Sequence, residues 1–191
     1  MLLVDRRWRP AELIEAGFEP KFVERVDEVM ADTYGAHIEW YNKRQGGSLT
    51  REQCMGGEVW QQVPEHRERI WQHYFEPGFF RELEPIAHSQ EVLRELVEKY
   101  QVYVASAAMQ FPNSLIEKHQ WLDEHFPFIH WRNRILLGDK HVLRGDVLID
   151  DRSHNLETFQ GRSILFTSPH NIHTTGYERA EDWMEVAQKL L

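Results

Sequence analysis

The stretch VLIDDRSHN, residues 147–155, carries the strongest structural signal in this chain. Its apolar residues run directly into two adjacent carboxylates, Asp150 and Asp151. A continuous apolar run is typical of a parallel strand that is buried on both faces. Open α/β sheets bind their ligands beyond the carboxyl ends of such strands. A simple Asp-Asp turn would also explain this stretch taken alone, so the prediction of a site depends on the rest of the chain.

The negative charges of the two acids must be compensated wherever these residues lie. Adjacent carboxylates repel each other unless a cation or another positive group lies between them. Carboxylate oxygens are hard ligands, and Mg²⁺ is the usual partner of such oxygens when the substrate carries phosphate. We therefore expect Asp150 and Asp151 to contribute to a Mg²⁺ site.

Two features upstream complete a pattern suited to phosphate. The run QVYVAS, residues 101–106, is rich in strand-forming residues and ends in a small hydroxyl residue, Ser106, at the same expected sheet edge. Lys140 precedes the acid pair in the loop GDK, residues 138–140. A hydroxyl can donate to a phosphoryl oxygen, an ammonium can neutralise developing charge, and carboxylates can hold the metal. The sequence thus predicts a cradle for a phosphoryl group.

With these residues in view, the chain resembles the 5'(3')-deoxyribonucleotidases of the haloacid dehalogenase-like phosphatases. The resemblance covers most of the chain from about residue 21 onward. The matching text is DEVMADTYGAHIEWYNKR (27–44), VYVASAAMQFPNSLIEKHQWLDEHFPFI (102–129), GDK (138–140), VLIDDRSHN (147–155) and ILFTSPHN (164–171).

The resemblance implies a fold, a reaction and a set of roles. The fold would be α/β, a Rossmann-like three-layer sandwich with a central parallel sheet. Its core would comprise residues 1–32 and 101–191, with a small helical cap, residues 33–100, inserted after the first motif. The reaction would be Mg²⁺-dependent hydrolysis of the phosphomonoester of (deoxy)nucleoside monophosphates. The implied site residues are Asp27, Ser106 and Lys140 for catalysis, Asp27, Asp150 and Asp151 for the metal, and Ser106, Ala107, Lys140 and Trp40 for the substrate.

The chain differs from the family at the position of the nucleophile. Family members open with an Asp-x-Asp motif, in which the first Asp is the nucleophile and the second the general acid/base. Alignment places the second at Asp27 and the first at Arg25. A guanidinium cannot attack phosphorus and would repel the metal. By the family mechanism we therefore expect the chain to be inactive or severely impaired.

This departure leaves a second function open. The chain could be a degenerate relative that binds a phosphate or nucleotide, or acts in regulation, without turnover. Arg25 would then stand in the metal's place as a fixed cation that pairs with Asp150 and Asp151. Such pairing would lower the cost of burying the acids, because an unpaired buried carboxylate is expensive.

The local pattern around this motif disagrees with the family fold. Glu24 and Arg25 would lie inside a central strand, whereas the apolar residues recur at helical intervals. On this pattern we predict that residues 20–44 are largely helical. The apolar stretch 1–5 could replace the missing strand and bring Asp5 near Ser106, although an edge strand with a solvated Asp is the simpler interpretation.

The remaining helices and strands are predicted from the spacing of apolar residues and from the residues that end such elements. We expect helices over residues 90–99, 112–125 and 177–191, and strands near residues 129–131, 134–137 and 164–166.

Composition bounds the functional classes. A length of 191 residues suits one sizeable core with a small insertion. The net charge of −9 argues against binding a nucleic-acid backbone, whereas one phosphate of a small ligand needs only a few donors. The one cysteine, Cys54, excludes an internal disulfide and suits the cytoplasm. We recognise no membrane-length apolar run and no signal peptide, so we expect no membrane partner, and homodimerisation stays open.

Overall fold

A computed structural model describes residues 2–3, 21–24, 28–138 and 140–191 of the chain. Asp5, Arg25 and Asp27 lie outside these residues. The strands are β1 (Leu2–Leu3), β2 (Lys21–Glu24), β3 (Gln101–Ser106), β4 (Arg134–Leu136), β5 (Val147–Asp150), β6 (Arg162–Phe166) and β7 (Glu178–Ala180). The α-helices are α2 (Thr33–Gln45), α3 (Val59–Gln62), α4 (Arg67–Gln72), α5 (Ser89–Lys99), α6 (Ser114–His125), α7 (Ser153–Glu157) and α8 (Trp183–Leu190). Short 3-10 helices include η1 (Glu52–Cys54), η2 (Pro64–His66), η3 (His73–Phe75), η4 (Ala108–Gln110), η5 (Trp131–Asn133), η6 (Lys140–Val142) and η7 (Pro169–Asn171).

The strands form a parallel sheet in the order β4-β3-β2-β5-β6-β7, and β1 pairs antiparallel with β3. The chain winds from β2 through β3 to β4 and then crosses back to β5, β6 and β7. The winding direction therefore reverses between the neighbouring strands β2 and β5, so a switch point lies at their carboxyl ends. Ser106 ends β3 and Asp150 ends β5, so both residues lie at this edge.

Helices cover both faces of the sheet, as the predicted α/β sandwich requires. Alternate strand residues enter different clusters because successive side chains point to opposite faces. Val104 and Ile149 pack with residues of α5, α6 and α8, whereas Ala105 and Leu148 pack with Leu156 of α7. The predicted fold class is thus confirmed.

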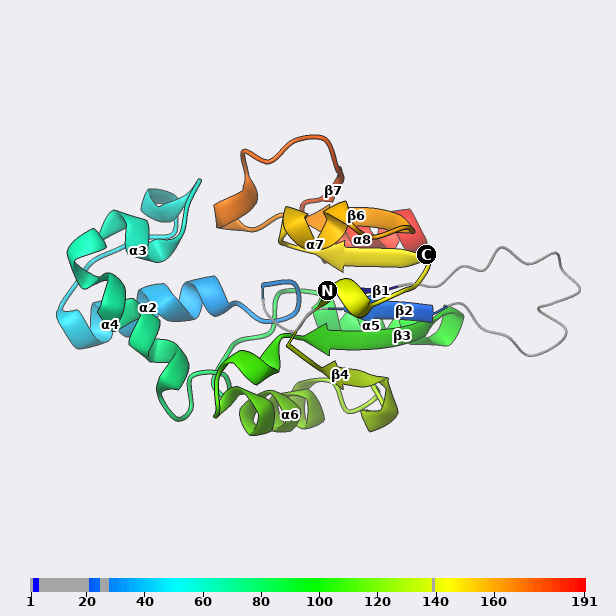
Figure 1. Cartoon of the computed structure of the whole chain (residues 1–191), viewed down its shortest axis with the longest axis horizontal. Coiled ribbons are helices and arrows are strands. Elements are labelled where there is room, and N and C mark those ends of the chain that lie inside the picture. Colours follow the sequence, from blue (N-terminus) through cyan, green and yellow to red (C-terminus); the bar gives the residue numbers. More distant parts are fainter. Residues whose placement is uncertain (1, 4–20, 25–27, 139) are drawn as a thin grey trace, which may run out of the picture.

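Residues 33–83 form a separate helical segment that contains α2, α3 and α4, and Figure 1 shows it at one end of the molecule, away from the sheet. Helix α2 begins where the Asp32 side chain accepts a hydrogen bond from the Gly35 amide at 2.9 Å, and it ends at Gly46 in the left-handed conformation. The predicted boundary of the cap at residue 100 stays a prediction. Helix α5 buries Val92 and Leu96 in the main core, which favours an earlier boundary.

Two linkers join the helical segment to the sheet, and they pair with each other. The amide of Asp32 donates to the carbonyl of Glu84 at 2.8 Å, and the amide of Ile86 donates to Met30 at 2.7 Å. An isolated antiparallel bridge between Ala31 and Pro85 accompanies these bonds. This paired backbone forms the hinge of the helical segment.

Two fully buried tryptophans anchor the linkers to the core helices. The indole N–H of Trp183 in α8 donates to the carbonyl of Val29 at 2.8 Å. That of Trp121 in α6 donates to Leu83 at 2.7 Å. A buried indole needs such a partner, so each tryptophan fixes one linker while it fills the core.

The helical prediction for residues 20–44 is wrong at its start and right at its end. Residues 21–24 form β2, which pairs with β3 on one side and β5 on the other. Backbone pairing on both sides outweighs the local side-chain pattern, since strand formation depends strongly on tertiary context. Residues 33–45 are helical as predicted.

Two smaller predictions also need correction. Residues 129–131 form no strand but lead into η5, and strand pairing starts only at β4. The last helix does not start at residue 177, because β7 first adds an edge strand beside β6. Helix α8 then begins at Trp183, where the Asp182 side chain caps its amino end.

None of the helices that the structure describes combines the length and apolar character needed to span a bilayer.

A buried histidine pair lies within the helical segment. The Nδ1 atoms of His37 and His73 are 3.2 Å apart, and both residues are at most 5% exposed. Burial, with His73 close by, lowers the pKa of His37 to about 3. Burial, with Arg44 close by, lowers the pKa of His73 to about 4. Both imidazoles therefore stay neutral in the folded protein over a wide pH range.

We predict that this pair makes the protein less stable in mild acid. An unfolded histidine takes up its proton near pH 6.5, so below that pH the unfolded state binds more protons than the folded state. The free energy of unfolding should fall as the pH drops from about 6.5 toward 4, by up to about 1.4 kcal/mol per pH unit for each histidine. Urea denaturation at several pH values between 7 and 5 gives the free energy of unfolding, which should fall less steeply with decreasing pH for His37→Leu than for wild type. An exposed control, His119→Gln, should keep the wild-type pH dependence. The same pH dependence in His37→Leu and wild type would contradict the assignment.

Candidate active site

The carboxyl edge of the sheet gathers the residues that the sequence singled out. Ser106, Asp150 and Asp151 are each 0% exposed. Lys140 opens η6 beside them, and its Nζ lies 3.6 Å from Oδ2 of Asp150. The lysine and the first acid are therefore an ion pair.

Asp150 is held by the turn that follows β5. Its Oδ1 accepts hydrogen bonds from the amide of Arg152 and from Nδ2 of Asn155, each at 2.9 Å. These bonds orient the carboxylate so that Oδ2 faces Lys140. The adjacent carbonyl of Asp151 accepts a bond of 2.7 Å from Asn171, which fixes the loop after β6 to the loop after β5.

Lys118 of α6 is a second buried ammonium at this edge, and our reading of the sequence missed it. It is 2% exposed, and its Nζ donates to Oγ of Ser106 at 3.1 Å while lying over the ring of Phe80. A signal was present, because Lys118 shares the core-facing side of α6 with Ser114 and Trp121. A lysine on such a face needs a partner or a ligand.

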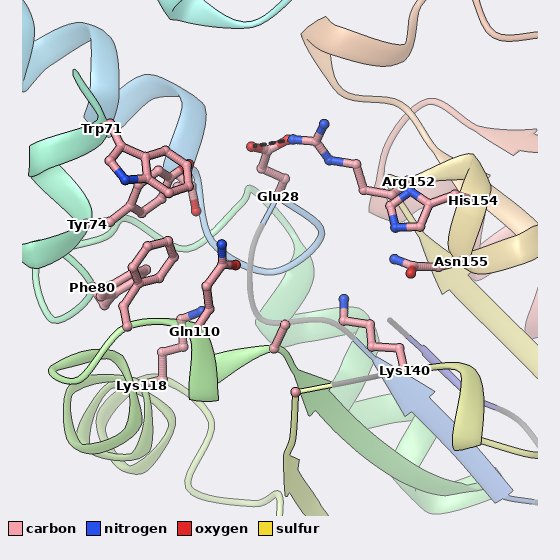
Figure 2. Close-up of a pocket in the computed structure, with 14 residues that line it drawn as sticks. Glu28, Trp71, Tyr74, Phe80, Gln110, Lys118, Lys140, Arg152, His154 and Asn155 are labelled. Atoms are coloured by element: carbon pink, nitrogen blue, oxygen red, sulfur yellow. Dashed lines mark ion pairs between the residues drawn. The ribbon is translucent and has the colours of Figure 1, made fainter. Parts of the chain in front are cut away.

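Lys118 and Lys140 line a pocket of about 370 Å³, within the range that small-molecule sites use. Figure 2 shows Trp71, Tyr74 and Phe80 on one side and Arg152, His154 and Asn155 on the other. The full lining is Glu28, Thr33, Trp71, Tyr74, Phe80, Ala107, Gln110, Phe111, Lys118, Gly138, Lys140, Arg152, His154 and Asn155.

Only some of the predicted substrate residues line the pocket. Ala107 and Lys140 line the pocket, and Ser106 reaches it through its bond to Lys118. Trp40 is not among the lining residues, because its ring packs edge-on against Phe79 with a centroid distance of 5.1 Å. Asp27 lies outside the described residues.

A network of Glu28, Asp151 and His170 lies beside the predicted metal ligands. Nδ1 of His170 is 2.8 Å from Oε2 of Glu28, and its Nε2 is 3.4 Å from Oδ2 of Asp151. Burial would lower the pKa of His170, but the hydrogen bond to Glu28 and the charges of both acids raise it overall. Ser168 also donates to Glu28 at 2.9 Å. The imidazole ring of His170 therefore bridges the two acids.

The ligand atoms of these three residues lie within 4.8 Å of one another, so they could also hold a metal. This group shares only Asp151 with the predicted set of Asp27, Asp150 and Asp151. The predicted set fits Mg²⁺ in its chemistry, since Asp150 and Asp151 offer hard carboxylate oxygens in a fully buried position.

Arg152 is a further lining residue that the sequence did not single out. Burial would lower the pKa of its guanidinium, but the charges of Asp151, Glu28 and Glu58 outweigh burial and raise it. Its Nε lies 3.4 Å from Asp151, and its other nitrogens lie 3.9 Å from Glu28 and 2.5 Å from Glu58. With Lys118 and Lys140, the pocket presents a set of fixed cations suited to a phosphoryl dianion.

Known proteins resemble the chain over nearly its whole length. Residues 22–191 match the sequence model of a family described as 5' nucleotidase, deoxy (pyrimidine), cytosolic type C protein. A Bacillus subtilis protein named 5'(3')-deoxyribonucleotidase is 36% identical over 166 residues, which cover 87% of this chain and 95% of that protein. A Staphylococcus epidermidis protein, provisionally given the same name, is 40% identical over 161 residues, 84% of this chain and 90% of that one.

A solved structure supports the fold independently. A haloacid dehalogenase-like hydrolase from Streptococcus pneumoniae superposes with a TM-score of 0.56 at 10% identity. The superposition covers 88% of this chain and 97% of that one.

We predict that Lys118 contributes to anion binding in this pocket. Replacing it in Lys118→Met removes one charged donor, so the affinity for inorganic phosphate should fall about tenfold or more. Isothermal titration calorimetry would measure this, with circular dichroism to verify folding. Lys43→Met removes a lysine from the exposed end of α2 and should leave the affinity unchanged. Equal affinities in all three proteins would refute the role of Lys118.

Proposed function

The chain belongs to the family described as 5' nucleotidase, deoxy (pyrimidine), cytosolic type C protein, and from that membership we propose that it is a Mg²⁺-dependent phosphomonoester hydrolase of deoxynucleoside monophosphates. The observation that carries the proposal is the pairing of Lys140 with Asp150 at the sheet edge where Ser106 ends β3. A hydroxyl, an ammonium and an acid pair at a switch point are the parts that phosphoryl transfer needs.

The roles follow from the chemistry of each group. The Ser106 hydroxyl would donate to a phosphoryl oxygen, and the ammonium groups of Lys118 and Lys140 would neutralise its charge. Asp27 would hold the proton that the leaving oxygen takes. Asp27, Asp150 and Asp151 would hold Mg²⁺, which supplies further charge neutralisation when bound. Ala107 follows Ser106 in the chain and lines the pocket.

The nucleoside would lie against the aromatic side of the pocket. Trp71, Tyr74 and Phe111 form a contiguous set, with Tyr74 and Phe111 stacked at a centroid distance of 4.6 Å and Trp71 edge-on to both. Aromatic side chains bind bases by stacking. Trp40 would act only through Phe79, on which it packs.

A second function is favoured by one observation in the sequence. Arg25 stands where the family has its nucleophile, and an arginine cannot form a phosphoryl intermediate. The protein would then bind a nucleoside monophosphate without turnover. Either function fits the cytoplasm, which the single buried Cys54 supports.

Turnover separates the two functions. The assay is release of inorganic phosphate from deoxythymidine 5'-monophosphate with Mg²⁺ and with EDTA, for wild type and for Arg25→Asp. Because Arg25→Asp restores the carboxylate, we predict at least a hundredfold higher rate in this variant than in wild type, and only with Mg²⁺.

The outcomes are distinct. A wild-type rate equal to that of Arg25→Asp would rule out the binding-only function and show that another group attacks phosphorus. Absence of Mg²⁺-dependent release from both proteins, together with no binding of the nucleotide, would refute the proposed function.

We further predict that Trp71 contributes to binding of the base and not of the phosphate. Trp71→Ala should weaken binding of deoxythymidine 5'-monophosphate about tenfold, because a base–aromatic stack is lost. Binding of inorganic phosphate should stay the same. Trp131→Ala, which removes an exposed tryptophan from η5, is the matched control. Equal losses for nucleotide and phosphate would place the effect of Trp71 elsewhere than in base recognition.

A further inference from the structure

The helical segment also touches the core at a place far along the chain from its hinge. Its tip, residues 52–62, comprises η1, α3 and the loop between them. The amide of Gly56 in this tip donates to the carbonyl of Pro169 in the loop after β6 at 2.8 Å. Glu58 of the tip pairs with Arg152 of the core at 2.5 Å. The helical segment is therefore held by its hinge, by bonds from Gly78 and Phe80 to Glu117 of α6, and separately by these contacts at its tip.

The attachments at the hinge and at the tip differ in strength. The hinge combines paired backbone hydrogen bonds with two buried indoles that donate to the linkers at Val29 and Leu83. Among the residues that the structure describes, the tip is bonded to the core by one backbone hydrogen bond and by the ion pair of Glu58 with Arg152, whose side chains are about 30% exposed. Any opening of the pocket on this side would thus separate the tip from the core before it disturbs the hinge.

The ion pair also reaches into the pocket, because Arg152 is one of its lining residues. The other carboxylates close to this guanidinium, Asp151 and Glu28, are farther away, at 3.4 and 3.9 Å. Figure 2 shows the arginine extended toward Glu28 across the top of the pocket. Its shortest ion pair among the described residues is with Glu58, which comes from the helical segment and not from the core.

Glu58 is itself held in place by its own helix. It is the N-cap of α3, and it exchanges hydrogen bonds with Gln61 in a capping box. The capping box thereby fixes the backbone at Glu58, whose carboxylate contacts Arg152. The contact that attaches the tip to the core is therefore also one of the contacts that place the guanidinium.

We propose that Glu58 is a positioning residue for the phosphate pocket: through Arg152, it couples docking of the tip to placement of a guanidinium beside the ligand. The inference rests on the proposed function, in that the pocket takes a phosphorylated ligand. Loss of the Glu58 carboxylate leaves Arg152 with its longer contacts to Asp151 and Glu28. The tip then loses its ion pair, and a bound ligand is less well enclosed.

The test compares wild type with three variants. Glu58→Gln keeps the shape of the side chain and removes its charge. Glu58→Asn also removes the charge but keeps a strong N-cap residue for α3. Glu65→Gln removes one negative charge from an exposed position of the same helical segment. The readouts are hydrogen–deuterium exchange of residues 52–62 and the rates of binding and release of deoxythymidine 5'-monophosphate.

We expect both Glu58 variants to increase amide exchange in the tip and to release the nucleotide about tenfold faster, because a charged hydrogen bond is lost. The association rate should not fall, since the change removes negative charge near an anion site. The nucleotide should slow exchange of the tip in wild type and in Glu65→Gln, and much less in the Glu58 variants. Nucleotide-dependent protection of the tip is a readout that helix capping alone would not move.

Two results would overturn this inference. Wild-type behaviour of Glu58→Asn would show that Glu58 serves only as a helix cap, and this variant decides the question even if Glu58→Gln fails to fold. Nucleotide release at the wild-type rate in both Glu58 variants would also overturn it, while leaving the proposed function intact. A wild-type protein that binds neither the nucleotide nor inorganic phosphate would instead overturn the proposed function and this inference with it.

Discussion

The constraint on which the site depends is the burial of two adjacent carboxylates at the end of β5. Asp150 and Asp151 are both fully buried, and removing such charges from water costs several kcal/mol for each ion unless they are compensated. Compensation comes from separate loops, as Lys140 faces Asp150 while Arg152 and His170 face Asp151. Ion pairs therefore hold the loops at this edge together, and these loops form one side of the pocket.

The helical segment supplies what the sheet edge lacks. The edge offers cations and carboxylates, whereas Trp71 and Tyr74 of the helical segment, together with Phe111 after η4, supply the aromatic wall. The pocket lies between the helical segment and the sheet edge, which paired linkers join, so under the proposed function the base and the phosphate would contact different walls. Arg152 lines the pocket from the sheet edge and pairs with Glu58 of the helical segment, so it connects the two sides.

The sequence predicted the parts of the site that follow from topology. Ser106 and Asp150 could be placed together because the carboxyl ends of parallel strands meet at one edge, and Lys140 lies in the loop beside them. Strand β2 could not be predicted from its own residues, since its stability comes from pairing with β3 and β5. Lys118 and Glu58 were missed for a similar reason, because their roles arise from neighbours far away in the chain.

The central claim is that the edge formed by Ser106, Lys140 and the acid pair is a phosphate site. A crystal structure of the protein grown with Mg²⁺ and phosphate tests it directly. The account predicts phosphate within hydrogen-bonding distance of the Ser106 hydroxyl and the Lys140 ammonium, with electron density for the cation at Asp150 or Asp151. Phosphate bound elsewhere on the molecule, with this edge holding only water, would contradict the account.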